Sequence, residues 1–103
     1  MIKIIHTKNR YCPIIHCDVC GEIITDAGMA AVLRKTQRLA EGEESEVLYV
    51  HKLRCLEIME HRLGNDTCMD EMNTHFMQLI LNAGSSPARL GEIQRTEDVV
   101  GRF

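Results

Sequence analysis

The stretch that decides the fold is Cys17-Asp18-Val19-Cys20-Gly21, a C-x-x-C-G sequence in the first fifth of the chain. Two cysteines separated by two residues can aim both sulfur atoms at one point across a tight turn. Gly21 supplies the backbone freedom that the chain needs where it bends back. One such pair provides half of the four ligands of a tetrahedral metal site. We therefore expect a second pair of ligands elsewhere in the chain.

The best candidate for the second pair is His51-Lys52-Leu53-Arg54-Cys55. A histidine and a cysteine at positions i and i+4 lie on one face of a helix, with Cβ atoms about 5–6 Å apart. The joint pattern is C-x2-C, thirty residues, then H-x3-C. Three cysteines and one histidine form a common closed shell for structural zinc. We predict a structural Zn2+ ion whose ligands are Cys17, Cys20, His51 and Cys55.

Other ligands and other uses of the cysteines stay open at this point. His16 could replace His51, and Cys12 could compete for the ion. A redox pair would need its first cysteine at a helix N-terminus, and the residues after Cys20 do not read as a helix. Cys68 is interpreted as a small apolar residue. Because five cysteines are an odd number and no secretory signal is apparent, we expect a reducing, cytoplasmic location.

Secondary structure before His51 is expected to be mainly extended. Residues 2–6 and 11–16 read as two strands joined by a turn, and Pro13 limits the second to an edge or irregular strand. Residues 29–50 are ambiguous. Apolar spacing from Met29 to Leu39 permits a helix, whereas a hairpin would return the chain economically to place His51 beside the first two cysteines. We favour the hairpin.

Two helices are expected after the second ligand pair. The first spans residues 52–63 and stops at Gly64-Asn65. The second spans residues 68–82, capped by Asp66 or Thr67, and its methionines are interpreted as core side chains. Residues 85–103 contain mixed charges and few apolar residues, so we expect a tail that is mobile or ordered only on a partner.

The order of these elements resembles the treble-clef group of zinc fingers over about residues 12–63. The matching residues are Cys17, Cys20, His51 and Cys55. The resemblance implies a small, zinc-centred α+β domain in which a knuckle and a β-hairpin are followed by helices, here over residues 1–84. It does not imply one function, because treble-clef domains bind nucleic acids, bind proteins or, with added catalytic residues, act as nucleases.

Composition narrows the class of function. The 103 residues suffice for one small domain, and the net charge of −3 argues against a generally basic nucleic-acid binder. No apolar run approaches the roughly 20 residues of a membrane span. We expect a non-enzymatic protein-binding module or adaptor with no small-molecule substrate. The alternative is nucleic-acid binding or transcriptional regulation; a nuclease is the least favoured. The tentative partner-binding residues are Arg34, Lys35, Arg38, Lys52 and Arg54.

Overall fold

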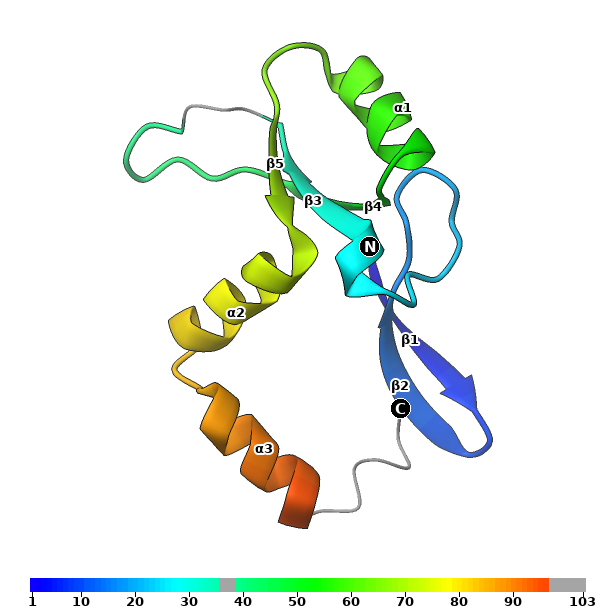
Figure 1. The fold of residues 1–103 in the computed structure, drawn as a ribbon, viewed down its shortest axis with the longest axis vertical. Coiled ribbons are helices and arrows are strands. Elements are labelled where there is room, and N and C mark those ends of the chain that lie inside the picture. The colour runs from blue at the N-terminus through cyan, green and yellow to red at the C-terminus, as the bar shows by residue number, and fades with distance from the viewer. Residues whose placement is uncertain (36–38, 97–103) are drawn as a thin grey trace.

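The computed structural model describes residues 1–35 and 39–96. It is an α+β fold, as expected, with two antiparallel sheets of two and three strands. Figure 1 shows the elements in space. In chain order they are β1 (Ile2–Thr7), β2 (Arg10–Ile15), the 3-10 helix η1 (Ala27–Met29), β3 (Ala30–Arg34), β4 (Val47–His51), α1 (Arg54–Leu63), β5 (Cys68–Glu71), α2 (Met72–Asn82) and α3 (Pro87–Thr96).

The first two strands form the predicted hairpin. β1 pairs with β2 from Ile2↔Ile15 to Thr7↔Arg10. The two turn residues, Lys8 and Asn9, both have positive φ (49° and 61°), which suits the twist of a two-residue hairpin turn. The hairpin extends away from the three-stranded sheet (Figure 1), and most of its residues are exposed.

The ambiguous region between Met29 and His51 is a hairpin, so the helical alternative is wrong. β3 pairs with β4 from Ala30↔His51 to Arg34↔Val47. β-branched and aromatic residues in Val47-Leu48-Tyr49-Val50 favour the extended backbone. On its other edge β3 pairs with β5, which gives the strand order β4-β3-β5. β3 is therefore the central strand of the sheet.

The two faces of β3 build two separate cores, because successive side chains of a strand point to opposite sides. Ala31 and Leu33 pack with Val50 of β4, Met59 of α1 and Cys17. Ala30 and Val32 pack on the other side with residues of β4 and α2 (Tyr49 and Met72). All four of these β3 residues are at most 1% exposed. We call these the metal face and the α2 face of the sheet.

The prediction of one helix over residues 68–82 is wrong for its first four residues. Cys68–Glu71 is the strand β5, whose residues pair with the free edge of β3 from Ala31↔Glu71 to Arg34↔Cys68. The helix begins at Met72, with Glu71 as its N-cap residue, so neither Asp66 nor Thr67 caps it. The hydrogen bonds available on the edge of β3 outweighed the local helix signal of Asp70 and Glu71.

The remaining helices differ from expectation at their ends. α1 begins at Arg54 rather than residue 52, but it ends at Leu63 as predicted. Its C-cap residue Gly64 has a φ of 82°, and the Gly64 N–H donates to Glu60 O at 3.0 Å. Pro87–Thr96 forms α3, which was not predicted. The expectation that residues 85–103 are mobile or ordered by a partner stays a prediction, and residues 97–103 lie outside the described range. Within the described range, no helix has the length and apolar character that crossing a membrane requires.

Candidate metal centre

The first two candidate ligands lie in a tight knuckle that follows β2. Cys17 N–H donates to Glu22 O at 2.8 Å, and Gly21 N–H donates to Cys17 O at 3.0 Å. Gly21 has a φ of 77°, a conformation that a residue with a Cβ rarely adopts. The Val19 N–H also donates to Cys17 Sγ at 3.4 Å. These bonds close the turn so that both sulfur atoms face the same side.

The other two candidate ligands are not on one helix, contrary to the expectation from their spacing. His51 is the last residue of β4, and Cys55 lies in the first turn of α1. Strand pairing reaches His51, and Lys52 N–H donates to Met29 O at 2.9 Å, which continues the contact with the chain before β3. The backbone then reverses at Leu53 (φ 68°, ψ −114°). This reversal brings Cys55 back beside His51.

The four predicted ligands meet at one point between the knuckle, β4 and α1. One ligand atom from each of Cys17, Cys20, His51 and Cys55 lies within 4.8 Å of all the others. Cys17 is fully buried and Cys20 is exposed, while the other two are half-buried. The group could hold a metal ion, and it faces the core on one side and solvent on the other.

The orientation of His51 is fixed by a backbone group that sequence analysis missed. His51 Nδ1 lies 3.4 Å from Cys20 Sγ, and His51 Nε2 lies 3.4 Å from Ile23 O. A metal on Nδ1 leaves the proton on Nε2, which can then donate to this carbonyl. Such a partner orients a ligating imidazole and selects its tautomer. A backbone carbonyl leaves no signal in the sequence, so only the structure could find it.

Asp18, inside the knuckle, ties the cluster to the sheet. Its carboxylate accepts a hydrogen bond from Tyr49 N–H at 2.8 Å, and its own N–H donates to Tyr49 O at 2.7 Å. These two bonds join the variable part of C-x-x-C to the middle of β4. The knuckle is therefore attached to the sheet even apart from any metal, which holds Cys17 and Cys20 near His51.

The cysteine side chains of the cluster shift one another's pKa values. Burial raises the pKa of Cys17, but hydrogen bonds from the backbone of Cys20, His51 and Val19 outweigh burial and lower that pKa to about 6. Burial, together with the neighbouring Cys17 and Cys20 sulfur atoms, raises the pKa of Cys55 to about 11. Three thiolates this close repel one another. A bound cation would offset that repulsion, so the arrangement is compatible with a bound metal ion.

The alternative ligands lie outside the cluster. Neither Cys12 nor His16 belongs to the group of four, and Cys68 lies in β5. Cys12 is a buried residue of β2. The Nδ1 atom of His16 is buried and has no hydrogen-bond partner among the described residues.

The tentative partner-binding residues divide between the two ends of the β3–β4 hairpin. Arg34 and Lys35 lie at the end opposite His51, whereas Lys52 and Arg54 follow it directly. Lys35 pairs with Glu46, and Lys52 Nζ lies 2.6 Å from Glu71 Oε2. Arg38 lies outside the described residues. No single basic patch joins the described members of this set, and their part in binding stays a prediction.

Comparison with known proteins finds no relative of this chain. No protein-family model, curated protein or solved structure matches the chain. The site must therefore be interpreted from its own geometry and chemistry.

Proposed function

We propose that the cluster holds one structural zinc ion. A tetrahedral ion with Zn–S of about 2.3 Å and Zn–N of about 2.05 Å sets its sulfur and nitrogen ligands about 3.6 Å apart. The 3.4 Å between Cys20 Sγ and His51 Nδ1 is close to that value. Soft thiolates with one imidazole favour zinc over harder ions such as Mg2+ or Ca2+. The expected stoichiometry is one zinc per chain.

We further propose that the protein is a non-enzymatic, zinc-stabilised protein-binding module. Four protein ligands fill a tetrahedral shell and leave no position for water or substrate, unlike a catalytic zinc site. The observation that carries the binding role is a set of large apolar side chains, each 40–56% exposed, on the consecutive helices α2 and α3: Met77, Leu79, Leu81, Leu90 and Ile93. Met77 and Leu81 are four residues apart and lie on one face of α2, whereas Leu79 lies on the opposite face. Contiguous apolar side chains on a surface are typical of protein interfaces.

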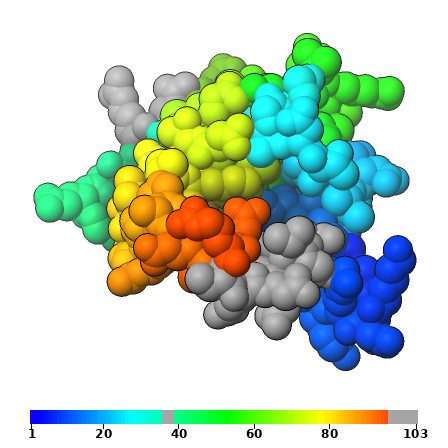
Figure 2. Space-filling model, turned by 60° about the horizontal axis from the view of Figure 1, so that its bottom comes forward, coloured from blue at the N-terminus to red at the C-terminus, as the bar shows by residue number. Residues whose placement is uncertain are grey.

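The position of these helices agrees with that role. Figure 1 shows α3 continuing beyond α2, away from the three-stranded sheet. Figure 2 shows α2 and α3, coloured yellow to orange-red, on one face of the molecule. Nucleic-acid binding has less support, because Lys35 and Lys52 are already paired with carboxylates. The proposed thiolate ligands also agree with a reducing location such as the cytoplasm.

The proposal is tested by affinity capture with the zinc-loaded full chain. A captured protein should bind saturably after purification, survive nuclease treatment, and be lost when Met77 and Leu81 are both replaced by Gln. Gln78→Ala, an exposed substitution on the same helix, is the matched control and should retain binding. The binding role is rejected if the double variant retains every saturable partner, or if capture depends on nucleic acid. Bound zinc in all three proteins shows that they are folded.

A further inference from the structure

Among the residues that the structure describes, no strand pairs with the outer edge of β1, which we call the free edge. Two backbone bonds, His16 N–H to Met1 O and Met1 N to His16 O, both 2.7 Å, make Met1 and His16 a hydrogen-bonded pair. Hydrogen-bonded and non-hydrogen-bonded pairs alternate along an antiparallel ladder. With the register of this hairpin, the pairs that contain Ile2, Ile4 and His6 are non-hydrogen-bonded. Their N–H and C=O groups therefore point away from β2.

The outer edge of β2 is different, because two of its residues lack a backbone group that is free to bond to an added strand. By the same alternation Tyr11, Pro13 and Ile15 point outward there. Pro13 has no N–H to donate. Ile15 O already accepts the N–H of Ile24 at 2.8 Å. An added strand would thus find a continuous set of donors and acceptors on β1 and not on β2.

The hairpin also has a charge opposite to that of the rest of the chain. Residues 1–17 contain three Lys or Arg residues and no Asp or Glu, whereas the whole chain carries −3, so residues 18–103 carry −6. The three cations are Lys3, Lys8 and Arg10. None of them forms an ion pair with another residue that the structure describes. The free edge therefore belongs to a locally basic element.

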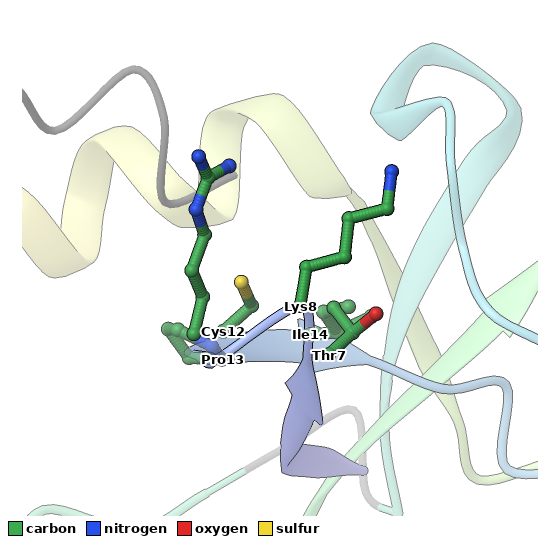
Figure 3. Close-up of a pocket in the computed structure, with 6 residues that line it drawn as sticks. Thr7, Lys8, Cys12, Pro13 and Ile14 are labelled. Carbon is green, nitrogen blue, oxygen red and sulfur yellow. The ribbon is translucent and has the colours of Figure 1, made fainter.

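Beside this edge, the two faces of the hairpin carry different side chains. Ile2 and Ile4 lie on one face and are 61% and 64% exposed, whereas Lys3 lies between them on the other face. Near the turn, a hollow of about 360 Å³ adds two cations and no carboxylate (Figure 3). It is lined by Thr7, Lys8, Arg10, Cys12, Pro13 and Ile14.

We propose that β1 receives an extended acidic segment of a partner protein, which adds to the hairpin as a third strand. Backbone hydrogen bonds from Ile2, Ile4 and His6 provide the affinity, as in other β-augmentation complexes. Apolar residues of the segment lie beside Ile2 and Ile4, and alternating acidic residues lie beside Lys3. A second copy is disfavoured as the added strand, because two hairpins of like charge would repel. This inference rests on the proposed protein-binding function and names a second contact for it.

The probe is a fluorescein-labelled eight-residue peptide that alternates valine and glutamate, titrated into the zinc-loaded full chain. A peptide that alternates valine and lysine is the matched control and should bind at least about tenfold more weakly. Ile4→Pro removes an outward N–H without removing a bond between β1 and β2, so it should weaken binding at least about tenfold. Ile4→Val retains the N–H and should stay within about threefold of the parent.

Zinc content and the thermal transition show whether Ile4→Pro remains folded. If it does not, Lys3→Glu provides the test. This variant should weaken binding of the acidic peptide and strengthen binding of the lysine peptide. The proposal is overturned if the acidic peptide shows no saturable binding, or if the folded proline variant binds it as well as the parent. Preference for a DNA duplex overturns it too, as does a dimer that Ile4→Pro disrupts. None of these results affects capture through Met77 and Leu81, so the two proposals fail separately.

Discussion

The metal face and the α2 face share the strand β3 but are held together by different means. On the metal face, Leu33 and Ala31 pack under a knuckle that is joined to the sheet by four candidate ligands and by Asp18. On the α2 face, Val32 and Ala30 pack against Met72, and one side-chain hydrogen bond, between Tyr49 Oη and His75 Nε2 at 3.3 Å, also joins the sheet to α2. The proposed zinc ion would cross-link one side of this small sheet, whereas the other side is held by ordinary packing. The two sides should therefore respond differently to the same kind of damage.

The largest effect is expected from loss of a ligand on the metal face. Cys20→Ser or Cys55→Ser should abolish the one bound zinc and most of the cooperative thermal transition. Structural zinc provides roughly 10–16 kcal/mol of apparent binding free energy in small finger peptides, which is comparable to the whole stability of about 5–15 kcal/mol of a small domain. Elemental analysis and calorimetry measure both quantities. Cys68→Ser, outside the cluster, is the control and should retain zinc; ligand variants that retain zinc and melt like the parent contradict the assignment.

Acidification should have the second largest effect, and it should destabilise the metal face before the α2 face. The pKa of Cys17 is lowered to about 6 in the fold from an ordinary 9.0, so its ionised form contributes stability that is present above pH 9 and is lost as pH falls through 6. Zinc adds to this, since its thiolate ligands must be deprotonated. We expect zinc to be retained at pH 7 and released as pH falls below 6, measured with a chromophoric chelator. Release that is independent of pH between 5 and 7 would contradict thiolate ligation.

Truncation of one core residue on each face tests whether the two faces differ in their effect on the metal site. Leu33 and Met72 are both at most 1% exposed, and replacing either by Ala should cost about 2–5 kcal/mol of unfolding free energy. The two variants should differ in their affinity for zinc. Leu33→Ala should weaken zinc binding because it loosens the packing around Cys17, whereas Met72→Ala should leave zinc affinity within about threefold of the parent. Denaturant unfolding with competitive chelation measures both; equal losses of zinc affinity would remove the distinction.

The smallest effect is a gain in stability on the metal face. Leu53 has a φ of 68° and a ψ of −114°, a conformation that favours glycine, and its side chain is 71% exposed. Leu53→Gly should relieve this strain and stabilise the fold by about 1 kcal/mol. Leu53→Ala, which retains the strain, is the matched control and should change stability by less than about 0.5 kcal/mol. Thermal unfolding of the zinc-loaded variants checks the sign.

Much of the metal face could be predicted from the sequence, because its signals are local. The C-x-x-C-G stretch, Gly64 and the strand-like Val47–Val50 each specify their own structure, and all four expected ligands came together. The split of His51 and Cys55 between a strand and a helix was missed. The i, i+4 spacing fits one helix, and only strand pairing, which involves distant residues, shows that His51 belongs to β4.

The α2 face was harder to predict because its decisive contact is distant. Cys68–Glu71 has an ordinary helix start in its sequence, with acidic residues in the expected first turn. It becomes a strand because β3, more than thirty residues earlier, has an open edge at that place. The carbonyl of Ile23 beside His51 could not be predicted for the same reason, since its role depends on position and not on residue type.

The sharing of β3 limits where the chain can change its length. One residue inserted within Ala30–Arg34 would reverse the direction of every side chain beyond it, exchanging those that pack under α1 with those that pack against α2. Deletion of one residue from that strand would do the same. Variation in length is better tolerated in the exposed turn at Glu41-Gly42, where added residues alter neither core. Natural or engineered insertions should therefore concentrate between β3 and β4 and be absent from β3 itself.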